Sequence, residues 1–273
     1  GSDVEINSSG NIVAVAARYE DGINFSGDGI TRVYQKVDGT WNQKGQAIEE
    51  ITNGGGVASI ALNSEGNILA TSCDRYPQVS NNTGVVRIFS FNGSSWIQMG
   101  GDLLGNGPSH YFGKCISMDG SGYTLAIGAP SINAGQVKVF EWNNSSWVQK
   151  GNVLFGTNNN DNFGRSVVLS KDGNTLAIGS PYNSDSFANA GKVQVFRWDG
   201  SLWNQIGNDI NGTQQGEDLG EEPKSISLSY DGNLLAIGSS KFDNNSLPNS
   251  SQDGKATVYA YQNGTWIMDG PEI

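Results

Sequence analysis

Hydrophobic residues in this chain are gathered in short runs, which alternate with polar turns rich in Gly, Asn and Asp. The clearest example is residues 163–207, which contain SVVLSKDGNTLAIGS and, after a polar stretch, KVQVFRWDGSLWNQI. Asp199-Gly200 lies between the last two runs, and such dipeptides favour hairpin turns because Gly readily adopts a positive φ. The pattern therefore predicts an antiparallel meander of four strands, over residues 166–170, 175–180, 192–198 and 202–206.

The same pattern occurs five times along the chain. Residues 112–151 repeat it closely, and three weaker copies cover the rest of the sequence. One tryptophan marks the same position in each copy: Trp41, Trp96, Trp147, Trp203 and Trp266. A repeat of about 50 residues that consists of short strands is typical of β-propellers. We therefore predict an all-β fold, a five-bladed β-propeller with four antiparallel strands in each blade.

The strands are apolar on both faces, as in the Leu-Ala-Ile-Gly segments at 125–128, 176–179 and 235–238. A blade that packs between two others buries both faces of its sheet, and we expect the five tryptophans to wedge between blades. The chain is expected to form a single domain over residues 1–273. The fifth blade would close a disc against the first, with part of a longer array as the alternative. The expected blades are residues 1–50, 51–104, 105–156, 157–212 and 213–273.

Charge and composition exclude some partners. The chain of 273 residues has a formal net charge of −11, and no cluster of Lys or Arg supplies the basic surface that nucleic-acid binding needs. No run approaches the roughly 18 apolar residues of a membrane span. An acidic, Lys-poor sequence rich in Asn, Ser and Gly is common in secreted proteins, so an extracellular or cell-surface location is expected. Cys73 and Cys115 either pair or remain two small buried thiols.

Two pairs of motifs resemble those of a known family. Phe112-Gly113 with Gly128-Ala129-Pro130, and Phe163-Gly164 with Gly179-Ser180-Pro181, are similar to the FG-GAP repeats of integrin α-subunit propellers and related cell-surface proteins. The resemblance implies blades that serve adhesion and partner binding, with calcium in the loop between the first two strands of some blades. The dipeptides that replace Phe-Gly in repeats two and five are Gly56-Val57 and Glu222-Pro223.

The calcium loops of that family are not reproduced well here. A calcium loop needs several oxygen ligands at alternating positions, whereas each loop here supplies one carboxylate, at Asp119, Asp172 or Asp231. These three residues are weak metal candidates, and we interpret them as turn residues. No metal and no cofactor are expected.

The loops between the second and third strands differ in every repeat, at 18–29, 74–83, 131–134, 182–190 and 241–253. In four repeats an aromatic residue follows the second strand, and cations and acids lie close to it in sequence. Irregular loops on a regular scaffold often carry function. These aromatic rings either bind a glycan or polypeptide or pin their own loops to the sheet edge. The candidate ligand-binding residues are Arg18, Tyr19, Asp74, Arg75, Tyr76, Tyr182, Asp185, Lys241, Phe242 and Asp243.

We therefore hypothesise a non-enzymatic extracellular binding or adhesion module, which recognises a glycan or an extracellular protein through its long loops as part of a larger protein. The alternatives are a structural subunit of an extracellular assembly and a five-bladed glycoside hydrolase. Such a hydrolase needs two carboxylates about 5–10 Å apart, and the acidic cluster is Glu217, Asp218, Glu221 and Glu222. The single His110 has no identifiable partner for a catalytic triad. Similar repeats without a singular motif argue against chemistry.

Overall fold

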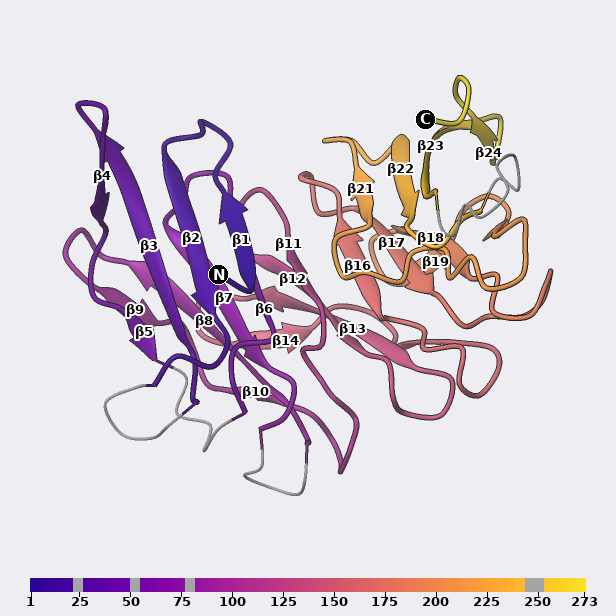
Figure 1. Ribbon diagram of the computed structural model, residues 1–273. Helices are drawn as coiled ribbons and strands as arrows, with labels where there is room; N and C mark the ends of the chain where they lie inside the picture. The colour runs from indigo at the N-terminus through magenta and orange to yellow at the C-terminus, as the bar shows by residue number, and fades with distance from the viewer. Residues whose placement is uncertain (22–26, 50–54, 77–81, 244–252) are drawn as a thin grey trace. The chain divides into compact units, whose positions relative to one another are not determined.

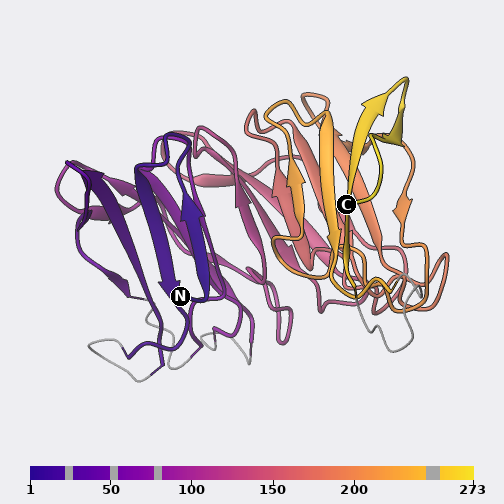
Figure 2. The ribbon, with the colours of Figure 1, turned by 45° about the horizontal axis from the view of Figure 1, so that its top comes forward.

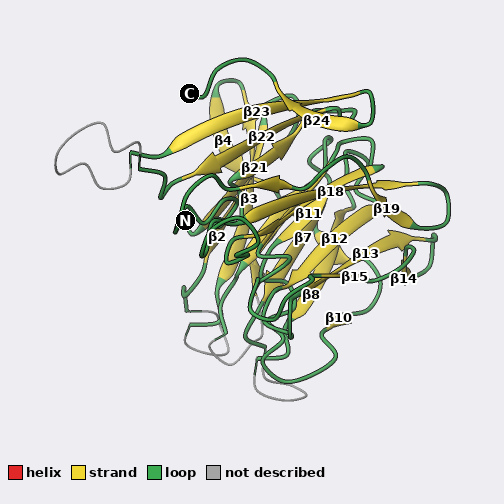
Figure 3. Ribbon diagram, turned by 90° about the vertical axis from the view of Figure 1, so that its right-hand side faces the viewer, coloured by secondary structure: helices red, strands yellow, loops and turns green. Residues whose placement is uncertain are grey.

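The computed structural model describes residues 1–21, 27–49, 55–76, 82–243 and 253–273 (Figure 1). Every secondary-structure element in these ranges is a β-strand, coloured yellow in Figure 3. The strands form five antiparallel sheets, one from each sequence repeat. The prediction of an all-β fold with five sheets of four antiparallel strands is confirmed. No helix in the described ranges is long and apolar enough to cross a membrane.

In each sheet the first strand pairs with the second, the second with the third and the third with the fourth, as the first sheet shows in Figure 2. The first strands are β1 (Asp3–Ile6), β6 (Ser59–Leu62), β11 (Ile116–Met118), β16 (Ser166–Leu169) and β21 (Ile226–Leu228). The second strands are β2 (Ile12–Ala17), β7 (Ile68–Cys73), β12 (Thr124–Ala129), β17 (Thr175–Ser180) and β22 (Leu234–Ser239). The third strands are β3 (Ile30–Val37), β8 (Val85–Phe91), β13 (Gln136–Trp142), β18 (Lys192–Trp198) and β23 (Lys255–Gln262).

The sequence predicts one continuous fourth strand in each sheet, but in four sheets the structure has two separate short strands there. The fourth strands are β4 (Thr40–Gln43), β9 (Trp96–Gln98), β14 (Trp147–Gln149), β19 (Trp203–Gln205) and β24 (Thr265–Met268). In four sheets a two-residue strand pairs further along the third strand: β5 (Ile48–Glu49), β10 (Leu103–Leu104), β15 (Leu154–Phe155) and β20 (Ile210–Asn211). The break in the fourth sheet contains Gly207, with φ of 70°. A Cβ atom there would lie 2.6 Å from the Trp266 side chain, so the break makes room for the next repeat's tryptophan.

Four tryptophans wedge between consecutive sheets, as predicted. Their indole N–H groups donate to backbone carbonyl oxygens at the break in the preceding sheet: Trp96 to Lys44 (2.7 Å), Trp147 to Met99 (2.9 Å), Trp203 to Lys150 (3.1 Å) and Trp266 to Ile206 (3.2 Å). For Trp41 the wedge stays a prediction. Its side chain lies beside the Lys36 ammonium, which is 6.0 Å from the ring centre.

The Phe-Gly motif connects one repeat to the next. Phe163 is fully buried, and its backbone forms a parallel bridge with Gly135, the residue before the third strand of the preceding repeat. In repeat five the same bridge joins Gly191 to Leu219. The equivalent dipeptide is therefore Leu219-Gly220, and the assignment of Glu222-Pro223 is wrong. The connection from this dipeptide to β21 is longer than in repeat four, which displaced the sequence alignment.

The packing divides the described chain into two units, Gly1–Ile127 with Phe140–Gln149 and Gly128–Val139 with Lys150–Ile273. In the first unit a buried cluster between the first two sheets includes Ile60, Leu69 and Trp96. In the second unit a similar cluster includes Val193, Leu235 and Trp266. Cys73 and Cys115 are both buried and unbridged. Parts of the variable loops, residues 22–26, 77–81 and 244–252, lie outside the described residues.

Candidate functional site

The weak metal candidates hold tight turns between the first two strands. Asp119 accepts hydrogen bonds from the Gly122 and Thr124 backbone N–H groups, at 2.9 and 3.0 Å. Asp172 and Asp231 accept from serine hydroxyls and backbone in the same way. Hydrogen bonds from Ser229 and Asn233 lower the pKa of Asp231 to about 2. No group of three or more His, Cys, Asp or Glu side chains suited to a metal ion occurs in the described ranges.

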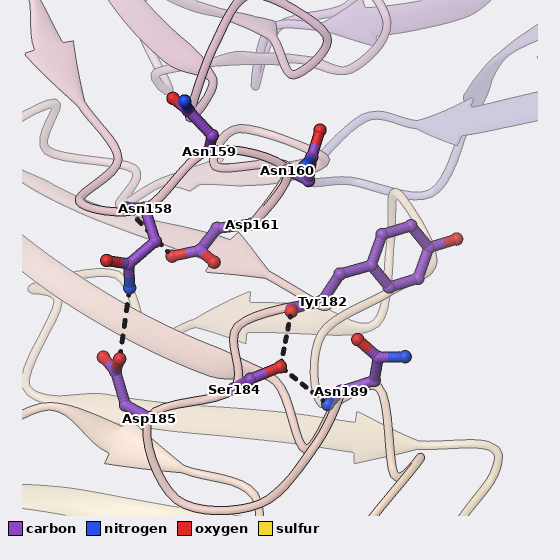
Figure 4. A pocket seen from close by; sticks show the side chains of 8 residues that line it. All are labelled: Asn158, Asn159, Asn160, Asp161, Tyr182, Ser184, Asp185 and Asn189. Atoms are coloured by element: carbon purple, nitrogen blue, oxygen red, sulfur yellow. Dashed lines mark hydrogen bonds between the residues drawn. The ribbon is translucent and has the colours of Figure 1, made fainter.

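A polar pocket lies in the second unit, at the opposite end of the fourth sheet from these turns. Its volume is about 480 Å³. Its walls come from two loops, the connection between β15 and β16 and the loop between β17 and β18. The lining residues, shown in Figure 4, are Asn158, Asn159, Asn160, Asp161, Tyr182, Ser184, Asp185 and Asn189.

The two loops owe their shape to asparagines and one buried acid. Asn160 and Asn189 have φ values of 72° and 50°, a region that Asn adopts more easily than other side-chain-bearing residues. Asp161 is buried, and its Oδ2 accepts from the Asn158 backbone N–H (3.3 Å) and from Nδ2 of Asn183 (2.8 Å). Since Asn183 belongs to the second loop and is itself buried, this contact fixes the two pocket walls together.

A second carboxylate gives the pocket a fixed negative charge. Asp185 accepts from Lys192 Nζ (2.8 Å), Asn183 Nδ2 (3.1 Å) and Asn158 Nδ2 (3.1 Å). The hydrogen bond from Lys192, followed by that from Asn183, holds the pKa of Asp185 below its ordinary value. Asp185 is thus an anion at neutral pH, with its side chain 47% exposed.

Tyr182 and three asparagine amides also present surface to this pocket. The Tyr182 residue is 37% exposed, and its hydroxyl donates to Glu221 at 3.4 Å. Figure 4 shows the side-chain amides of Asn159, Asn160 and Asn189 without hydrogen bonds to the other residues drawn. Within the described ranges no protein group hydrogen-bonds to these three amides. Each amide offers both donor and acceptor atoms, so the pocket suits a ligand with many hydroxyl groups.

The structure places the predicted residues of repeats one and two in the first unit. Asp74 is fully buried and accepts from Arg18 Nη2 at 3.2 Å and from Lys114 Nζ at 3.1 Å. Tyr19 is 58% exposed, with the Arg18 guanidinium 5.4 Å from its ring centre. Asp74 therefore joins three repeats, while Tyr19 remains free to contact a ligand.

Tyr76, from the same predicted set, has little surface for a ligand. It is only 6% exposed and clusters with Cys73 and Val85. The Arg87 guanidinium lies 5.4 Å from its ring centre. This placement corresponds to the alternative in which the ring pins its own loop. Arg75, one residue earlier, is exposed.

The predicted residues of repeat five are held by ion pairs. Lys241 contacts Asp218 at 2.6 Å and Glu221 at 2.8 Å. Phe242 and Asp243 are half-buried, and the Lys255 ammonium lies 4.1 Å from the Phe242 ring centre.

The acidic cluster of the hydrolase alternative is largely paired as well. Glu217 is buried and contacts Lys255 at 3.1 Å, and it accepts from the Ser239 hydroxyl at 2.9 Å. Asp218 and Glu221 are held by Lys241. Glu222 is exposed.

Sequence reasoning named Tyr182 and Asp185, and the structure brings both to the pocket. It missed the residues of the other wall, Asn158 to Asp161, as well as Ser184 and Asn189. The available signal was the run Asn158-Asn159-Asn160-Asp161 directly before Phe163-Gly164. Three consecutive asparagines there exceed what a short connection between sheets requires.

Comparison with known proteins supports the repeat and the fold. Residues 156–196 match the FG-GAP repeat family, which confirms the resemblance for the segment that contains all the lining residues of the pocket. No curated protein matches the sequence.

Among solved structures, a putative 6-phosphogluconolactonase from Bacteroides fragilis NCTC 9343 superposes with a TM-score of 0.64 at 14% identity, over 98% of this chain and 70% of that one. A functionally unknown protein from Desulfotomaculum acetoxidans DSM 771 gives 0.64 at 13% identity, over 98% and 68%. TolB from Acinetobacter baumannii gives 0.53 at 12% identity, over 97% and 53%. At these identities the likeness concerns the propeller fold alone.

Proposed function

We propose that this chain is an extracellular or cell-surface binding module, which recognises a glycan through the pocket between the two loops of the fourth sheet. The observation that carries the proposal is the partly exposed Tyr182 ring, which lines the pocket together with the side-chain amides of Asn159, Asn160 and Asn189 and the Asp185 carboxylate. The proposed module performs no chemistry on its ligand.

The chemistry of the pocket favours a sugar over an apolar ligand. The face of an aromatic ring is electronegative, and the C–H groups on one face of a pyranose can stack on it. Planar amides and carboxylates then pair with the hydroxyls at the sugar's edge, since each offers acceptors and the amides also offer donors. The lining contains one aromatic residue and no aliphatic one, which supports a polyhydroxylated ligand.

The negative charge of Asp185 narrows the ligand class further. An anionic sugar would be repelled at this carboxylate, whereas a neutral sugar could donate its hydroxyls to it. We therefore expect neutral hexoses or N-acetylhexosamines to bind, and sialylated or sulfated glycans to bind less well.

The experiment is a glycan array followed by calorimetry with the best neutral oligosaccharide. Tyr182→Ala should weaken binding at least about tenfold, because the stacking surface is lost. Replacing Asn159 and Asn160 together by Ala should weaken it by a similar factor. Tyr230→Ala is the matched control, since Tyr230 is 72% exposed in the turn between β21 and β22, and it should bind as the unmodified chain does.

Two outcomes would contradict the proposal. One is an array without any glycan signal, and the other is binding that Tyr182→Ala leaves intact. Hydrolysis of arabinan, xylan or a sugar lactone by the purified chain would instead favour the enzymatic alternatives.

A further inference from the structure

A second polar pocket lies in the first unit, lined by residues of the first two repeats. Its volume is about 430 Å³, which is within the range of small-molecule sites. Its walls come mainly from the turn between β1 and β2, the turn between β6 and β7, and two further residues of the first repeat, Gln35 and Lys44. Every lining residue belongs to the first unit. We call this cavity the Lys44 pocket.

Lys44 contributes a half-buried ammonium group without a counter-ion. Its Nζ lies 4.7 Å from the centre of the Phe91 ring, and no carboxylate in the described ranges pairs with it. Burial alone lowers the pKa of Lys44, because the ammonium loses hydration there. Other lysines with limited exposure have carboxylate partners within 3.1 Å: Lys114, Lys192, Lys241 and Lys255. The Lys44 pocket therefore holds a positive charge that the described residues leave uncompensated.

Two asparagines of the lining, Asn11 and Asn67, are oriented as hydrogen-bond donors. The Oδ1 atom of Asn11 accepts from Asn7 Nδ2 at 3.0 Å and from the Ser9 hydroxyl at 2.6 Å. The Oδ1 atom of Asn67 accepts from Asn63 Nδ2 at 2.8 Å. The Nδ2 groups of Asn11 and Asn67 have no acceptor among the described residues. Since the turns occupy the side-chain oxygens, the amide atoms that remain without a partner are N–H donors.

The turns beside this pocket are held by asparagine where the other repeats use aspartate. In repeats three to five a carboxylate accepts hydrogen bonds from the backbone of its own turn: Asp119, Asp172 and Asp231. In repeats one and two the neutral Asn7 and Asn63 do this instead, each accepting from two backbone N–H groups at 2.9–3.0 Å. Among the described lining residues the acid is Glu65, which is exposed. An anion would therefore meet less fixed negative charge here than beside the other turns.

We propose that the Lys44 pocket binds an oxyanion, the carboxylate or sulfate group of a small acidic molecule. Such a group accepts hydrogen bonds and donates none, so it matches the ammonium of Lys44 and the amide N–H groups of Asn11 and Asn67. The volume leaves room for a ring that carries the group. Repulsion by the net charge of −11 is weakened at physiological salt, where the Debye length is about 8 Å. The proposal does not rest on the glycan pocket, which lies in the other unit.

NMR titration of the lysine side chains at constant ionic strength tests the site, with sodium sulfate and sodium glucuronate as the two probes. The Lys44 signals should shift to saturation with at least one of them. The bound anion should also raise the pKa of Lys44, because it offsets the lost hydration of the ammonium. Saturation by sulfate alone would assign a tetrahedral group, and saturation by glucuronate alone would assign a carboxylate. Glucose, which carries no charge, should leave the Lys44 signals unchanged.

Three substitutions change the charge of the pocket, and the backbone amide signals of the two turns report binding by each variant. Lys44→Met should weaken binding at least about tenfold, because the charged donor is lost. The fold should tolerate it, since Met99 is the equivalent residue of repeat two and its backbone carbonyl accepts from a tryptophan in the same way. Asn67→Asp should weaken binding as much, because it keeps an acceptor for Asn63 but replaces the donor by a negative charge. Glu65→Gln should tighten binding about two- to fivefold.

Lys36→Met is the matched control, because Lys36 is exposed on β3 and lies outside the lining. It removes the same charge from the chain and should bind as the unmodified protein does. The proposal is overturned if neither anion gives a saturable shift, or if Lys44→Met binds as well as the unmodified chain. Equal weakening by Lys36→Met and Lys44→Met would overturn it too, since binding would then follow net charge alone.

Discussion

Tyr76 and Tyr182 both lie shortly after the second strand of their repeats, three residues after β7 and two residues after β17, and they have opposite environments. Tyr76 is almost completely buried, whereas Tyr182 is 37% exposed at the rim of a pocket. The offset of one residue matters, because Asn183, three residues after β17, is buried as Tyr76 is. The acids near the two rings also differ. Asp74 is fully buried and holds cations from two other repeats, while Asp185 is half-exposed and its cation, Lys192, belongs to its own sheet. Ion pairs hold the loop after β7 to two other repeats, whereas the loop after β17 keeps an exposed ring and carboxylate that a ligand can reach.

The largest effect in this comparison is expected from Asp74→Ala. Removal of the carboxylate leaves Arg18 and Lys114 close together and without their counter-ion, and their side chains are only 23% and 20% exposed. Breaking a buried pair in this way costs about 3–5 kcal/mol. Urea unfolding should show a loss of this size. Asp185→Ala should cost less, because the Asp185 side chain is 47% exposed and the buried Lys192 keeps its contact with Asp209 at 3.4 Å. Equal losses for the two variants would contradict the distinction.

Tyr76→Ala should rank next. The substitution empties a site that is filled by a ring among Cys73 and Val85, and such large-to-small changes cost about 3 kcal/mol or more. Tyr182→Ala should change the free energy of unfolding by less than about 1 kcal/mol, because part of that ring is already in water. The pair can be compared by thermal unfolding, and a destabilisation by Tyr182→Ala as large as that by Tyr76→Ala would show that both rings are structural.

Asn183→Ala probes how the open loop is held. Asn183 donates to both Asp161 and Asp185, so its loss leaves the buried Asp161 carboxylate with one fewer donor. We expect a cost of about 1–3 kcal/mol together with weaker glycan binding, because the two pocket walls lose their contact. Ser201→Ala is the control, since Ser201 is exposed in the β18–β19 turn of the same sheet and lies outside the pocket lining. Full binding by Asn183→Ala would mean that the walls keep their positions without this contact.

The strands and turns of each repeat could be predicted because they depend on residues close together in sequence. Asp199-Gly200 marks a turn, and the tryptophans mark outer strands. The errors arose where a residue's role depends on another repeat. Leu219-Gly220 escaped notice because Leu replaces Phe, and its bridge to Gly191 is a tertiary contact.

The same reasoning explains what was found and missed at the pocket. Tyr182 and Asp185 share one loop, so their sequence spacing revealed them. Asn158 and Asp161 are joined to the other pocket wall by their contacts to Asp185 and Asn183, which lie 27 and 22 residues further along the chain. Conversely, nothing in the sequence around Tyr76 indicates burial, because that depends on the Arg87 guanidinium and on the anchored Asp74.

The smallest effect concerns the charge state of Asp185. Because Lys192 lowers the pKa of Asp185 from the ordinary value of 3.8, the ion pair is fully present above that value. It is lost as the pH falls through the lower pKa of the folded state. Its contribution to stability is below about 0.5 kcal/mol, since the carboxylate is half-exposed and screened by water. An NMR titration of the carboxyl carbon should show the pKa of Asp185 rising towards 3.8 in Lys192→Met. The pKa of Asp231 should stay at about 2, because hydrogen bonds from Ser229 and Asn233 hold it. An unchanged pKa of Asp185 in Lys192→Met would mean that the asparagine amides alone hold this charge, and that the open loop needs no ion pair.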